Sequence, residues 1–286
     1  MVQPLQLRDA ERDLLYAFIE AEFGIDPRAR RRGTQQAWLE KLWKRVCSLG
    51  LSSFTAYVHH LKHDDPGHDE VRRAASLIAN NETYFFRERA QLAIFQNEIL
   101  AHIKRRKQIA DDHTITMYSV GCSSGEEVYT LAILVLSSRL FLPTWDIRIV
   151  GLDISESALQ TARAGIYQHS AFRAIDPVSL TPYLRARDGG AYAVKPWVRS
   201  LTSFRYANLT KPDLTAQLQD ADVIWCRNVL IYFSQKRCCQ VVTSLYNALQ
   251  PGGILLLGHA ESLAGIFSKF SLVRFPGAVA YVKDPR

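Results

Sequence analysis

The sequence has little that would hold a metal, a disulfide framework or a membrane anchor. Its five cysteines form no CxxC pair and have no His-rich spacing beside them, so neither a metal site nor a set of disulfides is expected. No apolar run approaches the length that spans a bilayer, and Met1 to Arg12 lacks the apolar core of a signal peptide. These absences favour a cytoplasmic protein with no membrane insertion.

What is present is an ordinary globular composition with one uneven feature, its charge. The 286 residues are 48% hydrophobic and 22% charged, enough for one large domain or two modest ones. The net charge of +7 is concentrated between Arg28 and Arg45, where seven basic residues accompany a single acid, Glu40. A patch this local indicates an acidic partner rather than general binding of polyanions.

Residues 1–80 are expected to form an all-helical domain. Apolar residues recur at helical spacing in four segments, and Gly24 and Gly50 follow the first two as stop signals. In the second segment, about Thr34–Leu49, Lys41, Lys44 and Arg45 fall on the face opposite the apolar stripe. The first helix is expected to bury Leu14, Leu15, Phe18, Ile19 and Phe23, the third begins near Ser52–Ser53, and the fourth covers about Glu70–Ile78.

Residues 81–286 are expected to form an α/β domain. Strands and helices alternate from about Thr114, which predicts a parallel sheet with helices on both faces. Between about Tyr183 and Tyr206 the alternation stops, and the turn Arg187–Gly190 predicts a small antiparallel β insertion at about 183–206. Near the C-terminus, Phe270–Phe275 and Val279–Val282 are typical of a closing antiparallel pair.

The segment Cys226–Phe233 carries the most informative side chains. It follows the apolar run Asp222–Trp225, a predicted buried strand, and it supplies Arg227, Asn228 and Tyr232 where that strand would end. Ligands of open α/β sheets bind beyond the carboxyl ends of the strands, so these side chains are candidates for holding a cofactor or a reacting group. The alternative is an ordinary polar turn between a strand and a helix.

Two other strand ends point to the kind of cofactor. After Thr114–Val120, a Gly-containing turn leads to Glu126 and Glu127 in the first turn of a helix, where two acids disfavour phosphate and suit a cationic group such as the sulfonium of S-adenosylmethionine. Asp153 ends the next strand, a position that typically accepts hydrogen bonds from ribose hydroxyls. The alternatives are that the glutamates only favour the helix dipole and that Asp153 caps the next helix. Together these features favour an adenosine-containing cofactor without a phosphate.

The ordered motifs of the chain resemble those of one family. NETYFFRE, from Asn81, is followed by VGCSSGEEVYTLA, GLDIS, ANL, CRNVLIYF and PGGILLLGHAES. This series is similar to the chemotaxis receptor methyltransferases, the CheR family, across nearly the whole chain. The resemblance implies a Rossmann-like class I methyltransferase domain that transfers a methyl group from S-adenosylmethionine to glutamates in the helical cytoplasmic region of chemoreceptors.

The resemblance also implies the roles of particular residues. Arg87 and Tyr232 match positions close to the transferred methyl group. The segment of about Thr34–Leu49 matches the basic helix that engages the receptor, so the expected receptor contacts are Lys41, Lys44, Arg45 and the Arg28–Arg32 cluster just upstream. The β insertion matches a part that binds a receptor C-terminal peptide in some members. The family pattern departs at Val128, Ser155 and Ala260, none of which is an implied cofactor contact, and at Thr34, where the basic helix is expected to carry a cation. The implied cofactor contacts are Asn81, Thr83, Arg87, Glu127, Asp153, Asn208, Leu209, Arg227 and Asn228.

Two other functions stay open at this point. The chain could be a cofactor-binding adaptor without turnover, docking through its basic helix, although Arg87, Arg227, Asn228 and Tyr232 are all retained. It could instead methylate RNA, with Arg28 to Arg45 contacting phosphates. Aromatic and aliphatic residues interrupt that strip, so a helical acidic protein is the favoured partner and nucleic acid is not expected.

Overall fold

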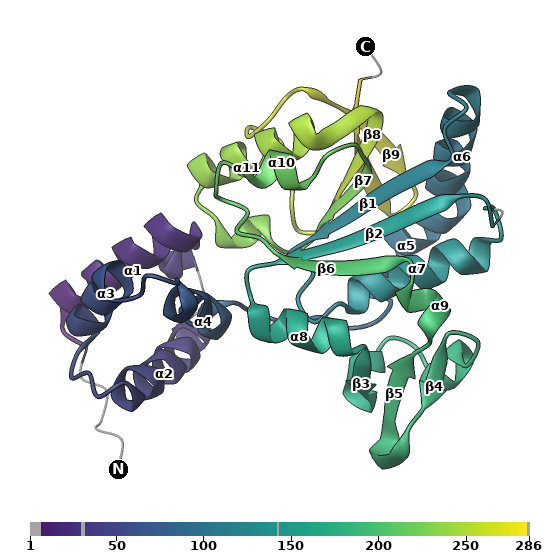
Figure 1. The fold of residues 1–286 in the computed structure, drawn as a ribbon. Helices are drawn as coiled ribbons and strands as arrows, with labels where there is room; N and C mark the ends of the chain where they lie inside the picture. Colours follow the sequence, from purple (N-terminus) through teal and green to yellow (C-terminus); the bar gives the residue numbers. More distant parts are fainter. Residues whose placement is uncertain (1–6, 30–31, 142, 285–286) are drawn as a thin grey trace.

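The computed structural model describes residues 7–29, 32–141 and 143–284, in which a bundle of helices precedes a large mixed sheet (Figure 1). The N-terminal helices surround their own apolar cluster, with Ile19, Leu42, Val46 and Tyr57 fully buried. Gly24 ends the first helix in the left-handed conformation, with φ of 71°, and Ser53 caps the third by accepting a hydrogen bond from the N–H of Ala56. These helices are α1 (Asp9–Phe23), α2 (Arg32–Ser48), α3 (Phe54–His63) and α4 (Asp69–Ile78).

The expected helical face of α1 is wrong at one position. Leu15, Phe18, Ile19 and Phe23 are buried as predicted, but Leu14 is 38% exposed. Leu14 stands at the margin of the apolar stripe of α1. The exposure of one leucine is ordinary for a soluble surface.

The large sheet has seven strands in the order β6-β2-β1-β7-β8-β10-β9. The strands from β6 to β8 run parallel, and β10 pairs antiparallel with both β8 and β9. The closing antiparallel pair at the C-terminus is therefore confirmed. The strands are β1 (Thr114–Val120), β2 (Asp146–Asp153), β6 (Thr202–Tyr206), β7 (Ala221–Cys226), β8 (Leu249–Leu257), β9 (Phe270–Phe275) and β10 (Ala278–Lys283).

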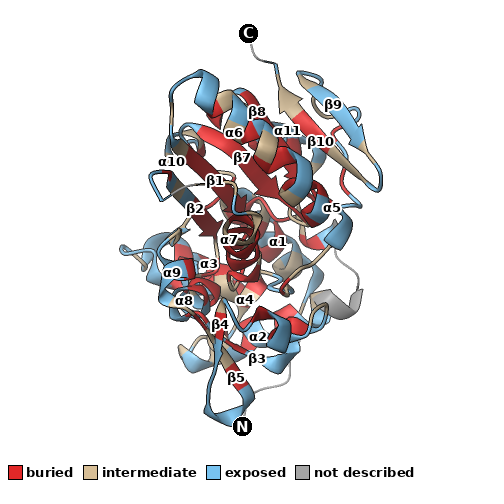
Figure 2. Ribbon diagram, turned by 90° about the vertical axis from the view of Figure 1, so that its right-hand side faces the viewer, coloured by how far each residue is buried: buried red, intermediate tan, exposed pale blue. Residues whose placement is uncertain are grey.

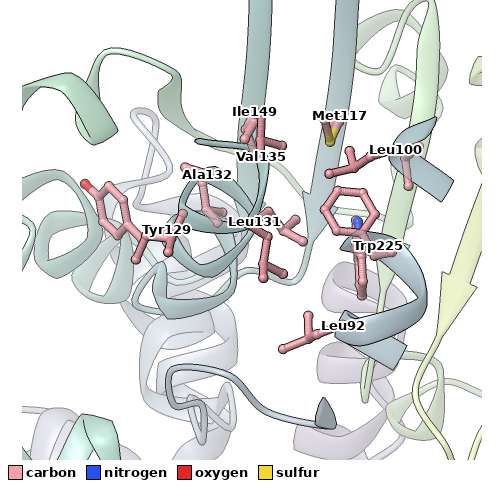
Figure 3. Close-up of a cluster of buried hydrophobic side chains, with 14 of the residues drawn as sticks. Leu92, Leu100, Met117, Tyr129, Leu131, Ala132, Val135, Ile149 and Trp225 are labelled. Atoms are coloured by element: carbon pink, nitrogen blue, oxygen red, sulfur yellow. The ribbon is translucent and has the colours of Figure 1, made fainter. Parts of the chain in front are cut away.

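Helices cover both faces of this sheet, which explains why its central strands β1 and β7 are buried over nearly their whole length (Figure 2). On one face, Trp225 of β7 and Met117 of β1 pack with Leu131 of α7 and Leu100 of α6 (Figure 3). On the other face, α11 packs against a second apolar cluster. The helices of this part are α5 (Arg89–Ile94), α6 (Leu100–Ile109), α7 (Glu126–Ser138), α8 (Glu156–Ala164), α9 (Pro196–Arg199), α10 (Leu214–Gln217) and α11 (Gln235–Ala248).

The predicted β insertion exists, but its expected limits are wrong. Its three-stranded antiparallel sheet, in the order β3-β5-β4, consists of β3 (Ile166–Gln168), β4 (Leu184–Ala186) and β5 (Ala191–Val194). Thr202–Tyr206, which the sequence assigned to the insertion, is instead β6, the parallel edge strand beside β2. The insertion therefore begins before residue 183, at β3, and ends before β6. Thr202–Tyr206 belongs to the large sheet because it pairs with β2, which is distant in the sequence.

Candidate active site

Several strand ends meet at one cavity. The strand order reverses between β1 and β7, and ligands of such sheets bind beyond the carboxyl ends at that point. A cavity of about 300 Å³ lies there, lined by the segments that follow β1, β2, β6 and β7, by the connection between α4 and α5, and by Phe23 and Ile25 of the helical bundle. Every site residue that the sequence predicted lines this cavity: Asn81, Thr83, Arg87, Glu127, Asp153, Asn208, Leu209, Arg227, Asn228 and Tyr232.

Asp153 lines the cavity and does not cap the next helix, because the N-cap of α8 is Ser155, so the capping alternative is wrong. One carboxylate oxygen accepts a hydrogen bond from the N–H of Ser155 at 2.8 Å, and the other accepts from the N–H of Ser123 at 2.7 Å. Burial raises the pKa of Asp153, and the backbone N–H groups oppose that rise. The carboxylate is thus fixed at the junction of β1 and β2, with lone pairs left to accept from a ligand.

The two glutamates of the first turn of α7 have separate environments. Glu127 lines the cavity, where its carboxylate accepts from Arg227 Nε at 2.6 Å and from Ser119 Oγ at 2.8 Å. Glu126 is buried away from the cavity, accepts from Ser124 Oγ at 2.8 Å, and has its pKa raised by burial. Only Glu127 is therefore placed to face a ligand.

The turn after β7 is held by a carboxylate that sequence reasoning missed. Glu261 accepts hydrogen bonds from the N–H groups of Asn228, Val229 and Leu230 at 2.7–2.9 Å and from that of Gly258 at 2.8 Å. This network stabilises Asn228 in the left-handed region, with φ of 58°. The sequence signal for this residue is the Glu of the GHAES motif, which could have been interpreted as a buried hydrogen-bond acceptor; the sequence analysis considered only Ala260 in that motif.

The connection between α4 and α5 forms one wall of the cavity. Asn81 donates through Nδ2 to Ser155 Oγ at 3.3 Å, and Arg87 donates through Nη1 to the carbonyl oxygen of Glu82 at 3.1 Å. Phe85 is fully buried and stacks on Phe172 with ring centroids 4.6 Å apart. Phe85 thus anchors the segment while Asn81, Thr83 and Arg87 face the cavity.

Asn208 joins the helical bundle to the cavity wall. Its Nδ2 donates to the carbonyl oxygen of Glu22 at 2.8 Å, and its Oδ1 accepts from the N–H of Thr210 at 3.0 Å. Lys211 pairs with Glu22 at 2.9 Å in the same region. The apolar residues Phe23 and Ile25 also line the cavity at this junction; the sequence predicted Phe23 only as a core residue and did not indicate Ile25.

The predicted basic face of α2 is only partly exposed to a partner. Lys41 and Lys44 are exposed, but Arg45 donates through Nε and Nη2 to the carboxylate of Glu70 in α4, the latter at 2.6 Å. Glu70 on the neighbouring helix engages Arg45, so a receptor-facing role for Arg45 stays a prediction, which this ion pair does not support. Arg30 and Arg31 of the predicted cluster lie outside the described residues, as does the side chain of Arg32, and Arg28 pairs with Asp13 at 3.1 Å.

The side chains of this cavity fit S-adenosylmethionine. Ile25 and Leu209 offer apolar surface for a purine, Asp153 offers an acceptor for ribose hydroxyls, and Glu127 offers a negative charge for an amino group. Gly121 allows close backbone approach: its φ is 74°, and a Cβ there would come within 2.4 Å of Val229 Cγ2. Arg227, a cation in the wall, is already paired with Glu127, so the cavity is not organised to receive a phosphate.

The strand order and the acceptors at its switch point define the protein as a class I methyltransferase that uses S-adenosylmethionine. The family described as CheR methyltransferase, SAM binding domain, matches residues 81–279, more than half of the chain. The chain is 34% identical over 244 residues to chemotaxis protein methyltransferase 2 of Vibrio cholerae, covering 85% of this chain and 83% of that one. It is 29% identical over 277 residues to chemotaxis protein methyltransferase 1 of Pseudomonas aeruginosa, covering 96% and 97%. The chain therefore belongs to the CheR methyltransferase family.

Across residues 7–29, 32–141 and 143–284, no helix is long and apolar enough to cross a membrane. In that part of the chain there is also no group of three His, Cys, Asp or Glu side chains that could hold a metal ion.

Proposed function

We propose that this protein methylates glutamate side chains in the helical cytoplasmic region of a chemoreceptor, giving glutamate methyl esters. The observation that carries the proposal is the presence of Arg87 and Tyr232 on the cavity that fits S-adenosylmethionine. The names of the relatives, which are chemotaxis protein methyltransferases, support a receptor substrate.

The reaction asks for positioning rather than for a base. A glutamate carboxylate is already ionised near neutral pH, so no proton has to be removed before it attacks. Holding a weak nucleophile in line with its target contributes roughly 7–11 kcal/mol in favourable cases. Arg87 suits this task because a guanidinium binds a carboxylate through two parallel hydrogen bonds.

The bound cofactor supplies an electrophilic methyl group on a sulfonium. A carboxylate oxygen forms the new bond to the methyl carbon, the sulfur–carbon bond breaks, and its electron pair returns to sulfur. Arg87 orients the attacking carboxylate, Tyr232 offers its hydroxyl beside the reacting atoms, and Glu127 and Asp153 fix the cofactor. The products are the methyl ester and S-adenosylhomocysteine.

Lys41 and Lys44 are the proposed receptor contacts on α2. Both are exposed and lie three residues apart on the helix, hence on one face. Their positive charge complements the acidic helix that a receptor methylation region would present. Arg45 is left out of this surface because it holds Glu70.

The first experiment is methyl transfer from radiolabelled S-adenosylmethionine to cytoplasmic fragments of candidate chemoreceptors. A carboxylate methyl ester releases volatile labelled methanol in alkali, whereas a methylated amine does not. We expect alkali-labile label on the receptor fragment, and we expect none when its methylatable glutamates are replaced by alanine. Alkali-stable label, or label on RNA alone, would reject the proposal.

Variants separate the reacting residues from the receptor contacts. Arg87→Ala should reduce turnover at least a hundredfold, while the matched change Arg89→Ala, outside the cavity lining, should leave it unchanged. Charge reversal at Lys41 and Lys44 should raise KM for the receptor fragment without changing the Kd for S-adenosylhomocysteine. An equal loss of cofactor affinity would contradict the separation of the two surfaces.

A further inference from the structure

We propose that Asn80 is a positioning residue for the phenol of Tyr232, an inference that rests on the proposed function. Asn80 lies just before the family motif that begins at Asn81, and the proposed mechanism gives it no role. Its Nδ2 donates a hydrogen bond to the hydroxyl oxygen of Tyr232 at 2.8 Å. The two residues are 152 positions apart, and both line the cavity.

The backbone around Tyr232 is already fixed by other contacts. The N–H of Tyr232 donates to the carbonyl oxygen of Val229 at 3.1 Å, and its own carbonyl oxygen accepts from the N–H of Asp26 at 2.8 Å. Beside it, Phe233 forms an isolated antiparallel bridge with Ile25. With the main chain held in this way, the direction of the phenol depends on the contacts of the side chain itself, to which Asn80 contributes.

Asn80 is also held from its own side. It is the second residue after α4. The C-cap of that helix is Ala79, whose N–H donates to the carbonyl oxygen of Ala75 at 2.8 Å. Ile78, immediately before, is buried in the core of the helical bundle. Asn80 therefore contacts Tyr232 from the end of a well-packed helix. Groups that position a reacting side chain have to be held by such rigid elements.

The chemistry of the amide sets the direction of the phenol proton. An amide nitrogen donates and does not accept, so the Tyr232 oxygen is the acceptor in this bond and its own hydrogen points to a different acceptor. A phenol oriented in this way can donate toward a reacting oxygen in the cavity. An aspartate at position 80 would reverse the bond, because an ionised carboxylate only accepts, so the phenol hydroxyl would donate its hydrogen bond to residue 80.

The test is a double-mutant cycle on methyl transfer between Asn80 and Tyr232, with S-adenosylhomocysteine affinity and thermal unfolding measured on every variant. Asn80→Ala should lower kcat about tenfold, which corresponds to about 1.4 kcal/mol, and Asn80→Asp should lower it further. The Kd for S-adenosylhomocysteine should change by less than about threefold, because misorienting one phenol affects the reacting step more than cofactor binding. In the Tyr232→Phe background, Asn80→Ala should have no further effect, since the hydroxyl it acts on is gone.

Each outcome of the cycle bears on a different claim. If Tyr232→Phe lowers kcat and Asn80→Ala does not, or if the two losses are simply additive, the positioning role of Asn80 is overturned and the proposed function stands. If Tyr232→Phe turns over like the wild type, the catalytic role of Tyr232 fails and the inference falls with it. Asn247→Ala, an exposed asparagine on α11, is the matched control and should leave kcat unchanged.

Discussion

Arg227 Nε donates a hydrogen bond of 2.6 Å to the Glu127 carboxylate, which joins the end of β7 to the first turn of α7 across the cofactor cavity. The pair lies at the point where the strand order of the sheet reverses. Glu88 adds a second acid 3.6 Å from the same guanidinium. The arrangement balances the positive charge of Arg227 and leaves the wall suited to a cationic ligand.

The first prediction concerns Glu127. Glu127→Gln removes the negative charge from the cavity wall and weakens the bond to Arg227, so the Kd for S-adenosylmethionine should rise at least tenfold, about 1.4 kcal/mol. Isothermal titration calorimetry measures this directly. The matched control is Glu126→Gln, because Glu126 is the adjacent residue but does not line the cavity. Equal losses of affinity in both variants would show that the cavity wall has been assigned wrongly.

The second prediction concerns Glu261, whose carboxylate holds the turn that carries Asn228. Glu261→Gln puts an NH₂ group among backbone donors, so the free energy of unfolding should fall by about 3 kcal/mol. Cofactor affinity should fall as well, because Asn228 lines the cavity. Denaturant unfolding and calorimetry of the same samples measure both effects. The exposed Glu98→Gln should change neither, and an unchanged stability of Glu261→Gln would contradict the role given to this network.

Much of this architecture was predictable because local patterns agree with the tertiary fold. Thr114–Val120 is a strand buried on both faces of a parallel sheet, and the sequence placed its limits to the residue. Asp153 and Arg227 could be grouped from the sequence because Asp153 ends one predicted strand and Arg227 follows another, and the carboxyl ends of parallel strands share one edge. The ordered motifs added Asn81, Thr83 and Asn208, whose roles as cofactor contacts stay predictions.

What escaped prediction depends on contacts between distant segments. Nothing near Thr202–Tyr206 distinguishes an insertion strand from an edge strand, and pairing with β2 decides it. The hydrogen bond between Asn80 and Tyr232 links residues 152 positions apart, and Glu261 binds a turn about thirty residues before it. A helical projection groups Arg45 with Lys41 and Lys44 by their positions on α2 alone. It contains no information on Glu70, the acid on α4 that pairs with Arg45.

The third prediction follows from that acid. Glu70 is buried, accepts from Arg45 and accepts from Tyr57 Oη at 2.7 Å, so it joins α2, α3 and α4. Arg45→Ala leaves a buried carboxylate without its counter-ion, and the free energy of unfolding should fall by about 3 kcal/mol. Lys44→Ala, an exposed change one residue earlier, should be nearly neutral in the same unfolding measurement. Comparable stability of the two variants would show that Arg45 has no structural role in the bundle and would leave receptor binding as its proposed role.

The fourth prediction is a pH dependence with a defined sign. Burial raises the pKa of Glu126 above its ordinary value of 4.5, so above pH 4.5 the folded protein retains a proton that the unfolded chain releases. The free energy of unfolding of the wild type, measured relative to Glu126→Gln, should therefore fall as pH rises from 4.5 to the raised pKa and level off beyond it.

Urea unfolding of both proteins across that pH range measures the difference, and the slope within the window should approach but not exceed about 1.4 kcal/mol per pH unit. The amide of Gln keeps an acceptor for Ser124 Oγ, so the comparison isolates the cost of burying the charge. Glu98→Gln at the exposed surface should give a flat difference. A wild type that gains stability relative to Glu126→Gln as pH rises would mean that the carboxylate is favoured in its charged form, and that α7 begins with a stabilising acid rather than a buried one.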